Sequence, residues 1–268
     1  MAMWRKAARL LAAGLLCLNG TAVAGAVCAP DLRFAADEIG SFWHAAPGGY
    51  GGIDKEVMEE VAKRLHCRLS LESDSVVRLI KRLEEGSVDV AGHKFYSAER
   101  ERVAWMLPYV QDRNVALVSS AIDVRDAESF IAKPGLRLGV GRSFAYGSSR
   151  FGQLIKRLDA AGRVEFVADS QQMYRLLLAG RVQAIITTPP AYHLELPPGM
   201  VGSRYLVQDW VPDQEQAALY LMLSRQRFNE TEKRRLEAVL AAMRKDGTML
   251  RILEKYMGER DAPALMLR

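Results

Sequence analysis

The 268-residue sequence predicts an α/β protein made of two similar lobes, each a sheet flanked by helices. Strand-like and helix-like patterns alternate as β-α-β-α-β over residues 31–91, which is typical of a parallel sheet with helices on its faces. The same order restarts over residues 136–187. With 49% hydrophobic and 26% charged residues, the composition excludes a disordered chain, a collagen and a disulfide-dense miniprotein.

Residues 1–26 are typical of a secretory signal peptide, which is removed from the mature protein. They combine an apolar run at residues 10–18 with small residues at 22–26 and three basic side chains, those of Arg5, Lys6 and Arg9. The apolar run is too short to span a membrane, which needs about 20 residues. Charged residues interrupt every later apolar stretch. We therefore expect an exported, periplasmic protein without stable membrane insertion.

Removal of this segment changes the charge and the cysteine count. The whole chain carries a net charge of +5, and three positive charges lie in the segment, which leaves +2 on the mature protein. No basic run remains, so nucleic-acid binding is not expected. Cys17 is removed as well, and the remaining pair, Cys28 and Cys67, favours one disulfide in an exported chain. Zinc is the alternative, but neither C-x-x-C nor H-x-x-H spacing accompanies the pair.

The elements of the first lobe follow from the spacing of its apolar residues. We expect, in order, a strand at 31–36, a helix at 54–65, a strand at 67–72, a helix at 75–85 and a strand at 88–91. Asp54 is predicted to cap the first helix, since it precedes three apolar residues with the spacing i, i+4, i+8, which are Val57, Val61 and Leu65. Gly86 is expected to end the second helix.

The second lobe repeats this pattern, and a smaller third segment follows it. We expect, in order, a strand at 136–140, a helix at 151–158, a strand at 164–167, a helix at 170–180 and a strand at 182–187. An apolar strand at 217–224 then precedes a helix that Asn229 caps and a terminal helix beyond Gly247. Because the third segment is too small to be a domain, we expect it to pack on the first lobe.

The chain is therefore expected to cross between the lobes twice. We place the crossovers near Val118–Ala121 and Asp209–Gln214. Residues 27–120 plus 212–268 would then form lobe 1, and residues 121–211 would form lobe 2.

Four motifs, in this order, resemble those of the type II periplasmic solute-binding proteins, family 3, the polar amino-acid branch. The segment 52–65 follows the family's pattern of acidic and apolar residues after a glycine, except at Lys55, where an apolar residue is usual. Asp89 followed by Ser97-Ala-Glu-Arg100 matches a second motif. The last two motifs are Pro108-Tyr109 and a closing set of Arg244, Asp246, Gly247, Thr248, Lys255 and Tyr256.

This resemblance implies a fold and a class of function. It implies two lobes joined by crossover strands, with a small-molecule ligand held in the cleft between them and hinge closure on binding. It also implies a monomer without catalytic residues, cofactor or metal, which delivers its solute to the permease of an ABC importer. The four histidines, which are scattered without metal-ligand spacing, are consistent with the absence of a metal site.

Arg100 is the leading candidate for ligand contact under this resemblance. The family places this arginine at the cleft, where a planar guanidinium can hold a carboxylate through two parallel hydrogen bonds. Ser97 is predicted to cap the helix that carries Arg100. The alternative is that Ser97 is only a helix cap and Arg100 is a solvated first-turn residue.

Several aromatic residues are further candidates for the walls of the cleft. Phe42 and Trp43 lie in the loop where the family walls the first lobe, and Tyr96 directly precedes Ser97. Phe144 and Tyr146 follow the first strand of the second lobe. Arg142, also in this region, is a candidate for a second positive contact. Core packing is the alternative for the aromatic residues, and simple surface exposure is the alternative for Arg142.

Three charged residues and one substitution concern the charge of the ligand. His93 and Lys94 precede Ser97 where the family offers small groups, so they would favour an acidic solute unless they are merely exposed. Asp37 can touch ligand or order its own loop. Thr188 stands where amino-acid binders carry an aspartate that pairs with the ligand's ammonium. Since a hydroxyl does not offset a buried ammonium charge, a standard α-amino acid is not expected.

Two other classes of function are kept beside the solute-binding protein. Relatives of this fold include cyclohexadienyl dehydratase-like enzymes that act on prephenate or arogenate, which need a general acid in the cleft. Glu38 and His93 are candidates for that acid, although no acid–base constellation stands out. The other class is a partner or sensor protein without transport. No phosphate-binding P-loop or G-x-S-x-G elbow is present, since the glycine-rich segment 48–52 lacks the P-loop ending.

Overall fold

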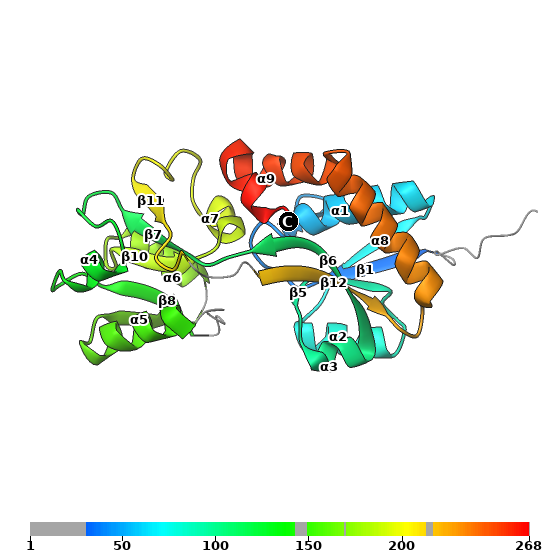
Figure 1. Cartoon of the computed structure of the whole chain (residues 1–268), viewed down its shortest axis with the longest axis horizontal. Coiled ribbons are helices and arrows are strands. Elements are labelled where there is room, and N and C mark those ends of the chain that lie inside the picture. Colours follow the sequence, from blue (N-terminus) through cyan, green and yellow to red (C-terminus); the bar gives the residue numbers. More distant parts are fainter. Residues whose placement is uncertain (1–30, 143–148, 169, 213–216, 268) are drawn as a thin grey trace, which may run out of the picture.

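The computed structural model describes residues 31–142, 149–168, 170–212 and 217–267. They form two lobes side by side, each built around its own five-stranded sheet (Figure 1). The mixed α/β class and the two-lobe arrangement that the sequence predicts are therefore confirmed. The proposed signal peptide at 1–26 and Cys28 lie outside the described residues, so the export signal and the Cys28–Cys67 disulfide stay predictions.

The sheet of lobe 1 combines segments from both ends of the chain. Its strand order is β4-β1-β5-β12-β6, with β4 and β5 parallel to β1, and β12 antiparallel to β5 and β6. The strands are β1 (Leu32–Ala36), β4 (Leu69–Ser73), β5 (Val90–Phe95), β6 (Ala104–Asp112) and β12 (Ala217–Ser224). The expectation that the third segment packs on the first lobe is correct, because β12 lies between β5 and β6.

Helices cover both faces of this sheet. One face packs against α1 (Ile53–Leu65), α8 (Glu230–Lys245) and α9 (Thr248–Leu265), which share one apolar core with β1, β6 and β12. The other face packs against α2 (Val76–Glu84), which contributes Leu79 and Leu83 to a smaller core, with α3 (Ala98–Val103) beside it (Figure 1). A short hairpin, β2 (His44–Ala46) and β3 (Gly49–Gly51), follows β1.

Lobe 2 has the same plan with strand order β11-β7-β10-β8-β9. Its strands are β7 (Val115–Ser119), β8 (Leu138–Gly141), β9 (Val164–Val167), β10 (Ala184–Thr187) and β11 (Tyr205–Gln208). Its helices are α4 (Ala127–Ile131), α5 (Ser149–Ala160), α6 (Ser170–Leu178) and α7 (Pro189–Glu195). Residues of α5 pack on one face of the sheet, and residues of α6 and α7 pack on the other.

The first crossover between the lobes lies earlier than expected. β6 ends at Asp112 in the first sheet, and β7 begins at Val115 in the second. Val118, which we expected at the crossover, instead pairs with Ala184 and Leu206 inside the second sheet. That expectation is wrong because it places the crossover inside an apolar strand sequence, whereas the passage coincides with the polar run at residues 111–114. The second crossover includes residues 213–216, which lie outside the described part of the chain.

Helix caps were predicted with mixed success. Ser97 caps α3 and accepts a hydrogen bond from the Arg100 backbone, as expected. Asn229 caps α8 and forms a reciprocal capping box with Glu232, also as expected. The prediction for Asp54 is wrong, since α1 begins at Ile53 after Gly52 and the Asp54 side chain is fully buried. A capping residue would instead lie before the first turn, with its oxygen on backbone N–H groups.

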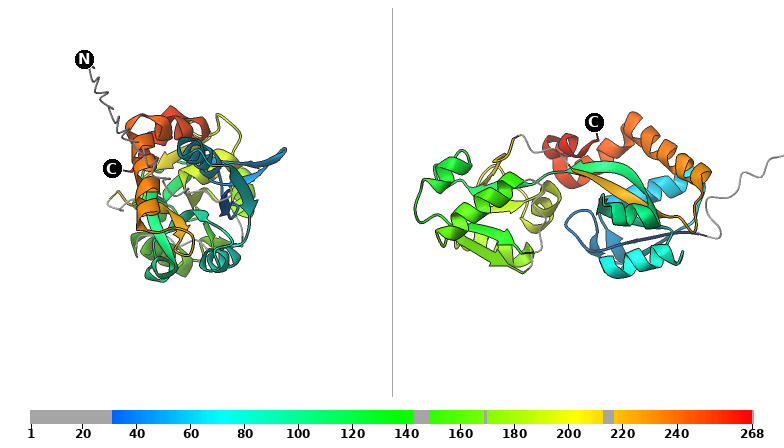
Figure 2. Two further views of the ribbon diagram at one scale, coloured as in Figure 1. Left: turned by 90° about the vertical axis from the view of Figure 1, so that its right-hand side faces the viewer. Right: turned by 60° about the horizontal axis from the view of Figure 1, so that its bottom comes forward.

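Each sheet has a point where the connections diverge to opposite faces. In lobe 1, β1 lies between β4 and β5, and the helices α1 and α2 that link them lie on opposite faces. In lobe 2, β8 lies between β9 and β10, with α5 and α6 on opposite faces. Parallel α/β sheets bind ligands outside the carboxyl ends of the strands at such points. The right-hand view of Figure 2 shows the two lobes side by side.

Candidate functional site

A cluster of ionisable side chains lies where β1 and β5 end. The lobe 1 charge cluster consists of Asp37, Asp54, His93, Lys94 and Tyr109. His93 Nδ1 is 2.5 Å from Asp54 Oδ2, and the Tyr109 hydroxyl donates to Asp54 Oδ1 at 2.5 Å. Lys94 Nζ donates to Asp37 Oδ1, and the second His93 nitrogen, Nε2, lies 3.3 Å from the same oxygen. One chain of polar contacts thus links α1, β5, β6 and the end of β1.

The electrostatics of the cluster favour paired charges. Burial and the Lys94 charge lower the pKa of His93, but the carboxylates of Asp54 and Asp37 outweigh them and hold that pKa above its ordinary value. Burial raises the pKa of Asp37, yet the contacts from His93 and Lys94 bring it well below the usual range. Burial also lowers the pKa of Lys94 and raises that of Tyr109. With His93 protonated, the two acids and two bases sum to zero.

The backbone of β5 is shaped around this cluster. His93 has φ 38°, in the left-handed region that non-glycine residues rarely adopt, and lies where the β5–β12 register shifts. A Cβ at Gly92 would overlap the Asp54 carboxylate, so this position requires glycine. Phe42 stacks on the His93 ring with centroids 5.7 Å apart. Such local strain is commonly found at functional sites, which makes this end of β5 a candidate.

Arg100 lies directly beyond this end of β5, in the first turn of α3. Its Nη1 donates to the Phe95 carbonyl oxygen at 2.7 Å, and its side chain is partly exposed. In the part of the chain that the structure describes, no carboxylate forms an ion pair with Arg100. Its positive charge is close enough to Lys94 to lower that pKa. Arg100 is therefore the one basic side chain that is not buried in what we call the lobe 1 edge, residues 37–43 and 93–100, which also carries the exposed carboxylates Glu38 and Glu99.

The predicted aromatic residues divide between the surface and the core. Tyr96 is exposed, and its hydroxyl donates to Glu101 Oε2 at 2.5 Å. Phe42 is buried against His93. Trp43 is fully buried, with its ring 5.3 Å from that of Phe34 and 4.8 Å from that of Tyr50, so it packs in the lobe 1 core. Phe144 and Tyr146 lie outside the described residues.

The corresponding edge of lobe 2 carries fewer charges. The lobe 2 edge consists of Arg142 after β8 and of Thr187 and Thr188 at the end of β10. Arg142 is exposed, and its guanidinium lies 5.6 Å from the centroid of the Phe166 ring. Thr187 is buried and shares a 2.5 Å hydrogen bond with Tyr174. Thr188 is partly exposed at the N-cap of α7, without a side-chain hydrogen bond to the helix.

One carboxyl group lies between the two edges, at the first crossover. Asp112 is buried at the end of β6, where its carboxylate accepts a hydrogen bond from the Arg113 backbone at 2.8 Å and the Thr188 side chain helps to lower its pKa. Burial raises the pKa of Asp112 to about 7 against these opposing contacts. Among the described residues no basic side chain forms an ion pair with it, because Arg113 pairs with Asp209. This group was not among the residues selected from the sequence.

The lobes also contact each other through α7. The Ser41 backbone N–H donates to the Pro190 carbonyl oxygen at 2.9 Å. The Tyr192 hydroxyl donates to Asp261 Oδ2 at 2.6 Å, and His193 Nε2 lies 2.8 Å from the same oxygen. Asp261 follows the kink of α9 at Gly258, which turns the end of that helix toward α7 (Figure 1). The lobe 1 edge and the lobe 2 edge are therefore held next to each other.

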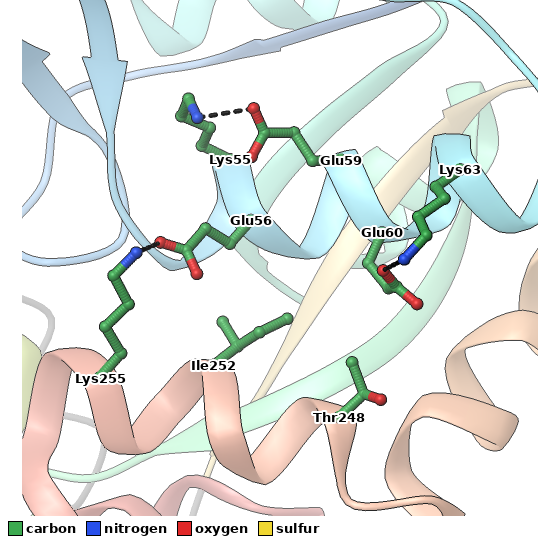
Figure 3. Close-up of a pocket in the computed structure, with 8 residues that line it drawn as sticks. All are labelled: Lys55, Glu56, Glu59, Glu60, Lys63, Thr248, Ile252 and Lys255. Atoms are coloured by element: carbon green, nitrogen blue, oxygen red, sulfur yellow. Dashed lines mark hydrogen bonds and ion pairs between the residues drawn. The ribbon is translucent and has the colours of Figure 1, made fainter.

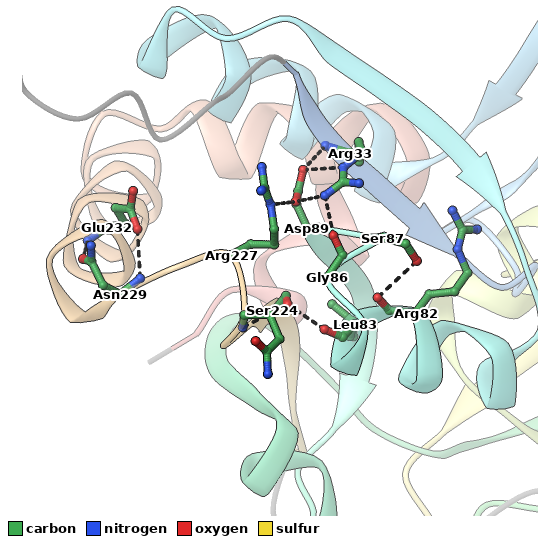
Figure 4. A network of polar contacts seen from close by, with 11 residues as sticks. Arg33, Arg82, Leu83, Gly86, Ser87, Asp89, Ser224, Arg227, Asn229 and Glu232 are labelled. Atoms are coloured by element: carbon green, nitrogen blue, oxygen red, sulfur yellow. Dashed lines mark hydrogen bonds and ion pairs between the residues drawn. The ribbon is translucent and has the colours of Figure 1, made fainter.

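Two other charged regions are structural. Asp89, a residue of the second motif, lies just before β5, at the end of that strand opposite the charge cluster. It accepts hydrogen bonds from the side chains of Arg33 and Arg227 (Figure 4). A surface groove of about 410 Å³ lies between α1 and α9 and is lined by charged side chains (Figure 3). These are already paired, as in Lys55–Glu59 and Lys255–Glu56. Neither region lies at the edge where the lobes meet.

Metal binding finds no support in the described residues. No group of three or more His, Cys, Asp or Glu side chains there is arranged to hold a metal ion. The described residues likewise contain no helix long and apolar enough to cross a membrane.

Sequence reasoning missed Asp54, Tyr109 and Asp112 as parts of the candidate site. Asp54 and Tyr109 both lie in motifs that carry the resemblance, so their positions were available as a signal. Their chemistry was not, because the contacts of Asp54 with His93 and with Tyr109 join residues 39 and 55 positions apart in the chain. No local pattern marks Asp112.

Comparison with known proteins gives a family and several structural relatives. Residues 37–259 match the model of the bacterial extracellular solute-binding proteins, family 3. Among curated protein sequences, none matches the chain. An ancestral cationic amino acid solute-binding protein superposes with a TM-score of 0.70 at 18% identity, over 85% of this chain and 96% of its own.

Two bacterial transporter domains have similar structures. The second substrate-binding domain of a putative amino acid ABC transporter from Streptococcus pneumoniae gives a TM-score of 0.67 at 17% identity, covering 85% of this chain and all of that domain. Substrate-binding domain 2 of GlnP from Lactococcus lactis, in an open conformation, gives 0.66 at 18% identity, over 85% and 95% of the two chains. At these identities the likenesses show the fold alone.

Proposed function

The chain belongs to the bacterial extracellular solute-binding proteins, family 3, and on that premise we propose that it captures a small carboxylate-bearing solute between its lobes for an ABC importer. The observation that carries this proposal is Arg100, a partly exposed guanidinium at the lobe 1 edge. In the described part of the chain it contacts the Phe95 carbonyl oxygen and pairs with no carboxylate.

The geometry of Arg100 suits an anion with two oxygens. A guanidinium has five N–H donors in a rigid fork, and the Phe95 carbonyl occupies one of them. The remaining donors can bind both oxygens of a ligand carboxylate in parallel. Ser97 supports this orientation because it caps α3 through the Arg100 backbone N–H at 3.2 Å. Ser97 therefore acts on the ligand through Arg100.

The neighbouring bases do not add to this positive charge. His93 and Lys94 are buried and contact Asp54 and Asp37, so their charges are balanced inside the lobe 1 charge cluster. Arg100 is therefore the positive charge that lobe 1 would offer to a ligand, beside the exposed carboxylates Glu38 and Glu99. Arg142 is the candidate for a second positive contact from lobe 2.

The ligand we propose lacks an α-ammonium group. Thr188 stands at the position of the expected aspartate, and its hydroxyl already interacts with Asp112. Asp112 is a poor counter-charge for an ammonium, since burial raises its pKa to about 7 and it is partly protonated at neutral pH. An amino acid would thus bury its ammonium with incomplete compensation.

No observation comparable to that on Arg100 supports the dehydratase-like alternative. His93, the buried candidate for a general acid, already contacts the carboxylates of Asp54 and Asp37. Glu38, the other candidate, is exposed in the loop after β1. A general acid must reach the proton acceptor on its substrate, and neither side chain is placed by a contact that favours this role.

Export completes the proposal. We propose that residues 1–26 are cleaved as a signal peptide and that the mature protein acts in the periplasm with the permease of the importer. We also propose a Cys28–Cys67 disulfide, which would tie the start of the mature chain to the strand after α1. Closing the loop of about 40 residues between these cysteines would stabilise the fold by about 3–4 kcal/mol in the chain-entropy model.

Calorimetric titration with small carboxylates and with common amino acids tests this function. We expect a carboxylate to bind to the wild type and Arg100→Gln to weaken it by about 10- to 100-fold, because charge-assisted hydrogen bonds are lost. Arg102→Gln is the matched control, since Arg102 is exposed on the same helix. The proposal fails if no carboxylate binds, or if amino acids bind tightly and Arg100→Gln leaves their affinity unchanged.

A further inference from the structure

The apolar side chains of the lobe 1 edge narrow the ligand class. We infer that the solute is a carboxylate with an aromatic body, which packs on Phe95 and Tyr96 while Arg100 holds its carboxylate. This inference rests on the proposed function and adds what the rest of the ligand is made of.

Large apolar side chains are exposed at this edge to an unusual degree. In the described part of the chain, Phe95 is 47% exposed, Tyr96 is 51% exposed and Ile39 is 43% exposed. Phe95 is the last residue of β5, Tyr96 follows it, and Ile39 lies three residues after the end of β1, near strand ends where ligands bind in this architecture. Exposed apolar side chains beside polar groups are typical of a binding site. An exposed apolar residue elsewhere, such as Val77 on α2, has no such neighbourhood.

The aromatic pair and the cation form one structural unit. The Phe95 carbonyl oxygen accepts a hydrogen bond from the Arg100 guanidinium at 2.7 Å. Phe95 therefore contributes its ring to the surface and also positions the positive charge of Arg100. Lys94, the preceding residue, contacts Asp37 and thereby brings the loop that carries Ile39 to the same edge. A ligand whose carboxylate reaches Arg100 would extend its body past these side chains.

The Tyr96 ring is also held in place before any ligand arrives. Its hydroxyl donates to Glu101 at 2.5 Å, and its ring centroid lies 6.1 Å from that of Tyr220. A fixed ring loses less conformational entropy when a second aromatic ring packs on it. Aromatic pairs contribute stabilisation beyond the buried area alone. The arrangement therefore favours an aromatic body over a flexible aliphatic one.

The charges around these rings argue against a second anionic group on the ligand. His93 and Lys94, which flank the site in the chain, are buried and paired with Asp54 and Asp37. Beyond Arg100, the exposed charged side chains of the lobe 1 edge are the carboxylates Glu38 and Glu99. Because these would repel a second negative charge, a monoanion with an apolar body fits this edge.

A matched set of probes tests the inference by calorimetric titration. 3-Phenylpropionate carries the carboxylate and the ring, propionate lacks the ring, and phenylalanine adds only the ammonium group. We expect propionate to bind about 100-fold more weakly than 3-phenylpropionate, because burial of a phenyl ring is lost. We expect phenylalanine to bind about tenfold more weakly than 3-phenylpropionate, because its ammonium is desolvated without a full counter-charge.

Variants of the rings locate the effect. Phe95→Ala and Tyr96→Ala should each weaken 3-phenylpropionate binding by about fivefold to tenfold and change propionate binding by less than about twofold. Val77→Ala is the control, because Val77 is 80% exposed on α2, away from the lobe 1 edge. Both ring positions are exposed, so both variants should fold, which circular dichroism would verify.

The outcomes distinguish a failure of this inference from a failure of the proposed carboxylate-binding function. If propionate and 3-phenylpropionate bind equally and only Arg100→Gln weakens them, the aromatic body is wrong and the carboxylate-binding function stands. The same holds if both ring variants bind 3-phenylpropionate like the wild type, in which case the rings serve contact between the lobes. If no carboxylate binds at all, the proposed function fails first.

Discussion

The lobe 1 edge and the lobe 2 edge occupy equivalent positions in similar sheets, yet their chemistry differs. At the first, the charge cluster is balanced and largely buried, and Arg100 is a partly exposed positive charge beside two exposed carboxylates, Glu38 and Glu99. At the second, the strand ends offer Thr187 and Thr188 together with Arg142, and the described part of that edge has no carboxylate of its own. The fold determines where a ligand would lie, and the residues at the strand ends determine which ligand.

The difference also concerns rigidity. Lobe 1 fixes its edge with contacts of about hydrogen-bond length among Asp54, His93 and Tyr109, all of them buried. These contacts hold their members in one arrangement, although His93 Nε2 has no hydrogen-bond partner among the described residues, and losing Asp54 would leave the other members without partners as well. Lobe 2 holds its edge mainly through the Tyr174–Thr187 contact and through α7. We therefore expect lobe 1 to be the more sensitive of the two edges.

The largest expected effect comes from removing the centre of the lobe 1 charge cluster. Asp54→Ala deprives His93 and Tyr109 of their acceptor and leaves an uncompensated positive charge in the core. We expect the free energy of unfolding to fall by about 3–5 kcal/mol, measured by urea denaturation. Glu59→Ala on the same helix is the control, since it removes only an exposed pair with Lys55 and should cost less than about 1 kcal/mol. Equal losses in the two variants would contradict this account.

The second effect concerns Asp112, the carboxyl between the edges. Its pKa rises from 3.8 to about 7 on folding, so the native state keeps a proton that the unfolded state releases. This contribution to stability is full below the unfolded pKa and is lost as pH rises toward the folded pKa. Asp112→Asn removes the ionisable group, and it should raise the free energy of unfolding by about 2–4 kcal/mol near pH 8 and little near pH 4.

Thermal unfolding at the two pH values measures this difference. Asp209→Asn is the control near the same crossover, because Asp209 is paired with Arg113 and its loss should lower stability by less than about 1 kcal/mol. If Asp112→Asn destabilises the protein near pH 8, the carboxyl is ionised and paired in the native state, and the contrast between the two edges is smaller than we describe.

The contrast between the edges also limits what the sequence could predict. Periodicity and capping residues predicted the α/β class and the caps at Ser97 and Asn229, because these depend on neighbours in the chain. The return of β12 to the first sheet was predicted on a different ground, since the third segment is too small to be a domain. The chemistry of the lobe 1 edge depends on residues far apart. Asp54, for example, has the sequence position of a cap but lies buried against a histidine 39 residues away.

The same limit applies to the aromatic and basic candidates. Trp43 was selected for the ligand wall, but its neighbours Phe34 and Tyr50 place its ring in the core. His93 and Lys94 were interpreted as charges facing an acidic solute, and only the structure shows the carboxylates that balance them. The sequence shows which charged residues are present, whereas the order of the strands in the sheet determines which of them contact one another.

The smallest effect we predict is a change in ligand preference at the lobe 2 edge. Thr188→Asp restores a carboxylate where amino-acid binders carry one, but in the wild type it would lie beside Asp112 and raise the pKa of both. We therefore place it in the Asp112→Asn background. There we expect the affinity for phenylalanine relative to 3-phenylpropionate to rise by about tenfold, because the ammonium gains a counter-charge.

Thr188→Asn in the same background is the matched control for this change, since it has the size and polarity of aspartate without the charge. Calorimetric titration of both variants with phenylalanine and 3-phenylpropionate gives the ratio directly. A tenfold shift in the aspartate variant alone would mean that one residue at the lobe 2 edge decides whether a ligand may carry an ammonium group. An equal ratio in the two variants would mean that the ammonium position lies elsewhere, and that the neutral character of the lobe 2 edge does not select the ligand.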